Sequence, residues 1–137
     1  MGGGLLCTFR EDQSEIMYKT QKIAGATEQC SVDYAFQRIG GKYKARILWH
    51  LANGTLRYGE LKRQLPDITP KMLTQALREL ETDHLIRRHV YPEVPPRVEY
   101  SLSDTGRGLM PAIELLSGWG KRQMVKLNIP VMEYQVC

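Results

Sequence analysis

The stretch ITPKMLTQALRELETDHLIRRHVYPEVPPRVEYSLS, residues 68–103, decides the fold. Its first part has the pattern of an amphipathic helix, in which Thr69 is a suitable N-cap and Pro70 fits the first helical position. Proline is tolerated there because its missing N–H would have no partner inside the helix. The apolar stripe consists of Leu73, Leu77 and Leu80, with His84 extending it. We therefore predict a helix over about Thr69–Asp83.

Beyond His84 the pattern changes from a helical period to an alternating one. Leu85–Tyr91 and Val98–Leu102 are typical of β-strands, and the second alternates strictly. The intervening Pro92–Arg97 contains three prolines and is too long for a tight turn. We expect it to project as a loop, so that the two strands form a wing.

Helical patterns also occur on both sides of this stretch. The predicted helices are Val32–Ile39, Lys44–Leu51, Arg57–Gln64 and a last helix from Ser103 or Asp104 to about Leu127, with a weaker one after Ser14 that carries Ile16, Met17 and Ile23. Short helices followed by a two-stranded wing are the winged helix-turn-helix plan. We expect a mostly α fold with a small antiparallel β wing. Residues 30–127 would form the domain, 1–29 a leader whose role stays open, and 128–137 a tail.

Length and charge narrow the class of protein. With 137 residues the chain has about one domain's worth of sequence. No apolar run approaches the roughly 18 residues of a membrane span, no secretory signal is visible, and three cysteines without CxxC fit a reducing compartment. These features predict a cytoplasmic protein without a membrane partner. The net charge of +4 is concentrated in the middle of the chain, and such a basic region favours a polyanionic partner.

The predicted helix Thr69–Asp83 would present groups that can bind double-stranded DNA. If its leucines face the core, the outward side chains are Lys71, Thr74, Gln75 and Arg78. Arginine can donate two hydrogen bonds to guanine and glutamine can pair with adenine in the major groove, while Thr69 and the first-turn N–H groups suit a phosphate. On the wing, Arg97 stands beside the proline loop, where it suits the minor groove. The alternative is that these residues are only a solvated helix face and a charged hairpin.

The last helix has a longer apolar face than its own domain needs. Leu109, Ile113, Leu116 and Trp119 recur at helical spacing. A homodimer interface would use this face and would place two reading helices about 34 Å apart, one turn of DNA. The alternative is packing against the N-terminal segment of the same chain.

Several motifs together resemble a known family. They are Ile39–Lys44 (IGGKYK), Arg57–Leu61 (RYGEL), Ile68–Thr74 (ITPKMLT), Val94–Tyr100 (VPPRVEY), Leu102–Arg107 (LSDTGR) and a cysteine before the first helix. From Cys30 to about Trp119 the chain resembles the HxlR-type winged helix-turn-helix regulators of bacteria and archaea. Tyr43 stands where tryptophan is common in that family, and Ser31 where proline is common. The resemblance implies a dimeric transcriptional regulator that recognises an inverted repeat, with Thr69, Lys71, Thr74, Gln75 and Arg78 on the reading helix and Arg97 on the wing.

Cys30 is a candidate sensor. Some relatives of this type sense quinones, aldehydes or oxidants through the cysteine at this position, which implies an oxidant or other small-molecule effector. A thiolate ahead of a helix is stabilised by the positive end of the helix dipole, although Asp33 would oppose this. The alternative is a small buried side chain that fills a gap.

The sequence argues against an enzyme. Gly40-Gly41-Lys42 lacks the GxxxxGK[ST] frame of a phosphate-binding loop, and the three histidines have no metal-ligand spacing. We therefore expect no catalytic residue, metal or cofactor. The remaining rival is a winged-helix module that binds proteins instead of DNA, and such a module would tend to lose the basic face that this chain keeps.

Overall fold

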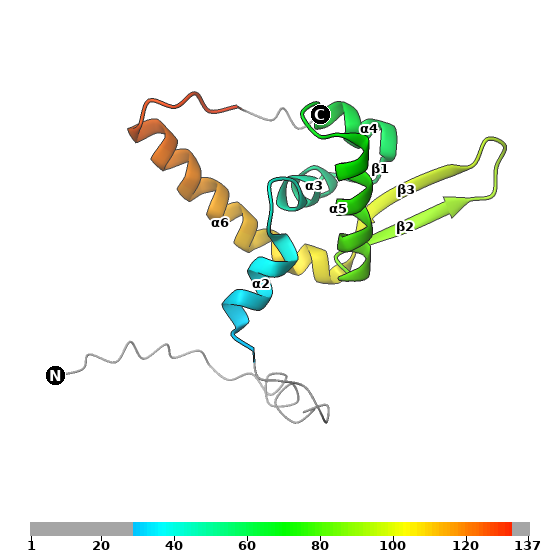
Figure 1. The fold of residues 1–137 in the computed structure, drawn as a ribbon, viewed down its shortest axis with the longest axis horizontal. Coiled ribbons are helices and arrows are strands. Elements are labelled where there is room, and N and C mark those ends of the chain that lie inside the picture. The colour runs from blue at the N-terminus through cyan, green and yellow to red at the C-terminus, as the bar shows by residue number, and fades with distance from the viewer. Residues whose placement is uncertain (1–28, 133–137) are drawn as a thin grey trace. The chain divides into compact units, whose positions relative to one another are not determined.

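The computed structural model describes residues 29–132, so the helix predicted after Ser14 lies outside the described residues. The elements are α2 (Ser31–Ile39), α3 (Lys44–Leu51), β1 (Leu56–Arg57), α4 (Tyr58–Gln64), α5 (Pro70–Thr82), β2 (Ile86–Tyr91), β3 (Arg97–Leu102) and α6 (Asp104–Lys126). From Val32 onward they belong to one compact unit, and β2 and β3 extend from it as a long hairpin (Figure 1). This order confirms the winged helix-turn-helix plan. Within residues 29–132, no helix is long and apolar enough to cross a membrane.

The sheet has three strands instead of the two that the sequence predicts. Its order is β1-β3-β2, and both pairings are antiparallel. Tyr100 of β3 lies opposite Leu56 of β1 on one side and opposite Arg88 of β2 on the other. The strand that the sequence did not predict is β1. It has only two residues, and so short a segment shows no detectable alternation of apolar and polar residues. It attaches the start of α4 to the base of the wing, which we define as residues 86–102.

The core forms around α3, α4 and α5. Ile47 and Leu48 of α3, Leu61 of α4 and Leu73 and Leu80 of α5 are fully buried. Burial of these side chains supplies the main favourable term, since each fully buried leucine or isoleucine contributes about 1.5–3 kcal/mol. The leucine stripe predicted for Thr69–Asp83 is therefore confirmed as the face that holds α5 in place.

His84 does not continue the stripe of α5, as the sequence predicted. The helix ends at Thr82, and His84 is exposed with a φ of 58°. The backbone N–H of Leu85 donates to the Leu80 carbonyl (2.9 Å) and that of His84 to the Glu81 carbonyl (3.0 Å), which is a Schellman end. This turn leads the chain directly into β2.

The start of α6 is fixed against this same turn. The Ser103 hydroxyl donates to the His84 carbonyl (2.6 Å) and accepts from the Gly106 backbone N–H (3.0 Å), so Ser103 is the cap rather than Asp104. A Cβ on Gly106 would lie 2.1 Å from the Leu85 carbonyl oxygen. The helix can approach the turn this closely only because residue 106 has no side chain.

Candidate nucleic-acid interface

The face of α5 opposite its leucines is polar and accessible. Lys71, Gln75 and Arg78 are exposed and Thr74 is half-buried. We call these four residues the reading face. Because they occur at spacings of three and four, they lie along one side of the helix. The structure thus brings together the four outward residues that the sequence predicted.

The first turn of α5 is held by two hydrogen bonds. The Thr69 hydroxyl accepts from the backbone N–H of Met72 (3.2 Å), as expected of an N-cap. The Tyr58 hydroxyl, at the start of α4, donates to the Pro70 carbonyl (3.2 Å). The two helices of the helix-turn-helix are therefore joined at the N-terminus of α5.

One reading residue already has a partner within the protein. The Gln75 side-chain amide donates to Glu79 (2.7 Å), and the Lys44 ammonium pairs with the same carboxylate (2.6 Å). The Lys44 bond, and secondarily that of Gln75, holds the pKa of Glu79 below its usual range. Gln75 must leave this contact or share it in order to pair with adenine.

Asp67 connects α3 to the turn before α5. The Arg46 guanidinium donates two hydrogen bonds to its carboxylate (3.0 and 3.1 Å), and the Lys42 ammonium lies 2.9 Å away. The Tyr43 hydroxyl donates to the Asp67 carbonyl (3.1 Å). These bonds, led by that of Arg46, hold the pKa of Asp67 well below its usual range. Asp67 lies two residues before Thr69, so this cluster fixes the entry of the chain into α5.

Arg97 on the wing is largely engaged within the wing itself. Its guanidinium lies over the Tyr91 ring, 4.0 Å from the centroid, and within 3.5 Å of both Glu93 and Glu99. Two acidic neighbours reduce the positive potential that a phosphate would meet. Arg97 therefore shapes the wing as well as charging it.

Arg88 of the wing is a further interface candidate, because it lies next to α5. A hollow of about 290 Å³ between α5 and the sheet is lined by Arg88 and by Thr74 and Arg78 of the reading face. Arg88 pairs across the sheet with Tyr100 and is two residues from the buried Ile86. Alternation along β2 could have placed Arg88 on the side of Ile86, facing α5.

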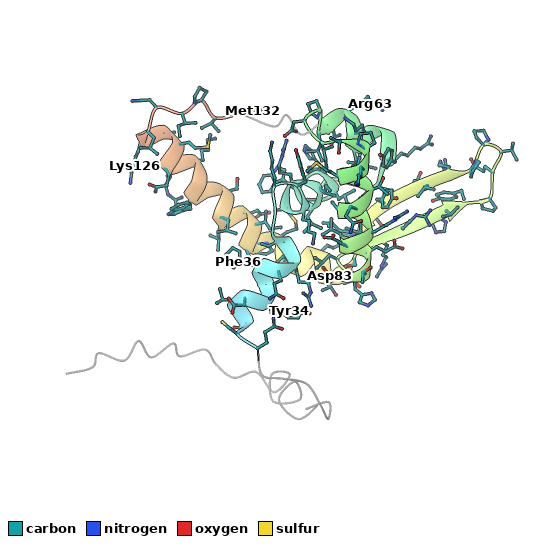
Figure 2. All side chains as sticks on the ribbon, in the orientation of Figure 1. Tyr34, Phe36, Arg63, Asp83, Lys126 and Met132 are labelled. Atoms are coloured by element: carbon teal, nitrogen blue, oxygen red, sulfur yellow. The ribbon has the colours of Figure 1, made fainter. Side chains whose placement is uncertain are left out.

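The residues predicted for a dimer interface divide into two groups. Ile113 is buried in the core of its own chain (6% exposed), and Leu109 packs partly against that core. Leu116 and Trp119 are 47% and 59% exposed. Further apolar side chains of α6 and α2 are also exposed. Figure 2 marks Tyr34 and Phe36, two such residues of α2. Cys30, directly before α2, is exposed rather than filling a gap, and Asp33 lies in the first turn of that helix.

The described residues contain no group of three or more histidine, cysteine or acidic side chains that could hold a metal ion. The features that these residues do present are a helix-turn-helix, a polar face on α5 and arginines on the wing.

Comparison with known proteins identifies the family. An HTH-type transcriptional regulator of Methanothermobacter thermautotrophicus is 52% identical over 92 residues, which cover 67% of this chain and 70% of the relative. The crystal structure of the HTH-type regulator YtcD, known from Bacillus subtilis, is 50% identical with a TM-score of 0.67, over 70% of this chain and 98% of that one. The redox regulator HypR in its reduced form is 41% identical with a TM-score of 0.69, over 72% and 98%. These relatives are transcriptional regulators and not enzymes. Since residues 38–128 match the family described as HxlR-like helix-turn-helix, the chain belongs to that family of DNA-binding regulators.

Proposed function

We propose that the protein is a transcriptional regulator that recognises a specific operator as a homodimer. The observation that carries the proposal is the reading face of α5, which presents Lys71, Gln75 and Arg78 to solvent on a helix anchored by buried leucines. A helix of this kind fits the major groove, where its outward side chains meet the base edges.

Each part of the interface has a distinct role in this proposal. Arg78 donates two hydrogen bonds to a guanine, and Lys71 and the capped N-terminus of α5 hold phosphates. Thr74 and Gln75 contact neighbouring bases, Gln75 after leaving Glu79. The wing lies along the adjacent minor groove, where Arg97 and Arg88 face the backbone.

The exposed apolar side chains of α2 and α6 support the homodimer. Leu116, Trp119 and Phe36 are about half exposed, and exposed large apolar side chains are typical of an interaction surface. A twofold dimer would read two half-sites in opposite orientation, so the operator is an inverted repeat. Ile113 serves its own core, and the contact between the two chains falls on Leu116 and Trp119.

Cys30 is the proposed sensor of an oxidant or electrophile. It is exposed and precedes the positive end of α2, where a thiolate is stabilised. The relative HypR, named a redox regulator, supports the same role here. Addition of the Cys30 thiolate to an electrophile would change the size and charge of the side chain directly before α2.

A mobility-shift titration with diamide or a quinone tests this proposal. We expect the wild-type protein to bind DNA and to release it when the reagent is added. The Cys30→Ser variant should bind DNA equally well and should not respond to the reagent. A response that survives Cys30→Ser eliminates Cys30 as the sensor. Absence of binding to any duplex at low salt favours a protein-interaction module instead.

A further inference from the structure

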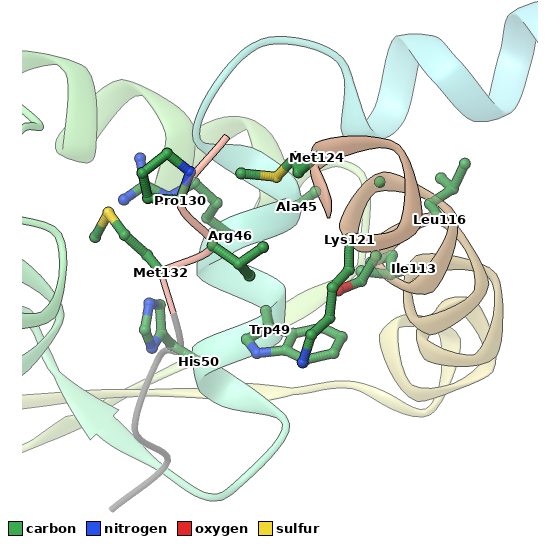
Figure 3. A pocket seen from close by; sticks show the side chains of 13 residues that line it. Ala45, Arg46, Trp49, His50, Ile113, Leu116, Lys121, Met124, Pro130 and Met132 are labelled. Atoms are coloured by element: carbon green, nitrogen blue, oxygen red, sulfur yellow. The ribbon is translucent and has the colours of Figure 1, made fainter. Parts of the chain in front are cut away.

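A cavity of about 750 Å³ lies between α3 and α6, away from the reading face. Trp49 on α3 and Ile113 and Met124 on α6 give it apolar walls (Figure 3). The chain returns over it after α6, because Asn128 adopts a φ of 54° and the Ile129 N–H donates to the Met124 carbonyl (2.9 Å). This turn brings Pro130 and Met132 into the lining.

The polar groups at this cavity are all basic or neutral. Arg46, His50 and Lys121 contribute to the lining, and none of the described residues that line it is acidic. Burial, and secondarily the charge of Arg46, holds the pKa of His50 below its usual range, so near neutral pH it is a neutral donor. The cavity thus combines an apolar interior with the ammonium of Lys121 and with the guanidinium of Arg46, whose charge Asp67 partly compensates.

We infer that this cavity binds an amphipathic organic anion, with its apolar body against Trp49 and Met124 and its carboxylate at Lys121 and Arg46. A mostly apolar cavity with a few convergent polar groups is the usual form of a small-molecule site. The charges select an acid over a neutral molecule of the same shape, because a charge-assisted hydrogen bond is about twice as strong as a neutral one.

Arg46 also provides a physical connection from this cavity to the DNA-binding helix. The guanidinium that lines the cavity donates both hydrogen bonds to Asp67, two residues before the N-cap of α5. An anion that draws Arg46 toward itself weakens this hold on the entry to α5. This second step rests on the proposed function, and it makes the ligand an effector that lowers DNA affinity.

Ligand binding is tested without DNA, with decanoate as the probe and decanamide as its neutral match. Binding is followed by titration calorimetry of the wild-type chain, so Trp119 of the proposed dimer contact stays unchanged. We expect a saturable change with decanoate that is weakened about tenfold by Lys121→Gln, whereas decanamide binding is unaffected by that substitution. Lys126→Gln, on the last turn of α6 and outside the cavity, is the matched control and should change nothing.

Three results would overturn the inference. One is the absence of saturable binding, and another is equal affinity for the acid and the amide with no effect of Lys121→Gln. The third is binding of decanoate only after residues 133–137 are removed, because the chain itself would then occupy the cavity. Binding of decanoate only to a dissociated monomer would likewise show that a second copy occupies it.

The connection to α5 is measured separately by titrating DNA with and without saturating decanoate. We expect decanoate to lower the DNA affinity of the wild type and to leave that of Asp67→Asn unchanged. Decanoate that binds without changing wild-type DNA affinity contradicts the connection. The ligand-free titration reports on DNA binding alone, so failure of the proposed function is distinguishable from failure of this inference.

Discussion

The Arg46 guanidinium on α3 donates two hydrogen bonds, of 3.0 and 3.1 Å, to the carboxylate of Asp67, which lies 21 residues further along the chain. Bidentate arginine–carboxylate contacts fix direction as well as distance. Lys42 and Tyr43 hold the same residue from the turn before α3. The angle at which the chain enters α5 is thereby set by α3, which also lines the cavity next to α6.

Asp67→Asn should lower both DNA affinity and stability at neutral pH. The folded-state pKa of Asp67 is depressed, so its contribution is present above the ordinary value of 3.8 and is lost as the pH falls through the folded pKa. Urea unfolding of the variant should therefore depend less on pH in the acid range. We expect DNA affinity to fall about three- to tenfold, since Arg46 and Lys42 lose their charged acceptor. The exposed Glu114 of α6, changed to Gln, is the control, and identical acid profiles for Asp67→Asn and wild type contradict the account.

Arg78→Ala should weaken operator binding by about 1–3 kcal/mol and relax the base preference at one position of each half-site. Arg78 is exposed and is the C-terminal member of the reading face. Competition titrations with operators that carry single base changes measure this. Equal weakening on every sequence would show that Arg78 contacts only the backbone.

The arginines of the wing should differ in their effect on salt dependence. Each phosphate contact contributes a slope of about 0.9 in a plot of log affinity against log salt concentration. Arg88→Ala should lower the slope by about one contact. Arg97→Ala should lower the slope by one contact or less, since Glu93 and Glu99 partly neutralise the charge of Arg97. Unchanged slopes for both variants remove the wing from the phosphate contacts.

Two glycines of α6 should respond in opposite ways to substitution by alanine. Gly106→Ala places a Cβ 2.1 Å from the Leu85 carbonyl oxygen, and such overpacking typically costs about 1–3 kcal/mol. Gly108→Ala meets nothing within 4 Å, so the better helix propensity of alanine should stabilise the protein by about 0.5–1 kcal/mol. Urea unfolding of the two variants measures both effects. A stable Gly106→Ala protein would refute the close approach of α6 to the turn at His84.

The sequence was most informative where one local rule decides the structure. Thr69, Pro70 and the leucine stripe defined α5, and strict alternation defined β3, because capping and periodicity act within a few residues. Contacts between distant segments could not be predicted in this way. The Arg46–Asp67 clasp, the third strand at Leu56 and the burial of Ile113 depend on how the helices pack.

The same distinction applies to the candidate interface. Helical spacing predicted which residues of α5 face outward, and the structure exposes Lys71, Gln75 and Arg78 accordingly. It could not show that Gln75 binds Glu79 or that Arg97 lies between two glutamates, since these partners are set by side-chain conformation. The position of Arg88 beside α5 could have been predicted from the sequence, because Arg88 alternates with the buried Ile86 along β2.

The central claim is that α5 reads a specific DNA sequence, and selection from a pool of randomised duplexes tests it most directly. The wild-type protein should enrich an inverted repeat with half-sites about one helical turn apart, and Arg78→Ala should lose one base preference symmetrically in both halves. Lys126→Ala, on the last turn of α6, should enrich the same sequence as the wild type. A wild-type pool that stays random after repeated selection at low salt would contradict the account.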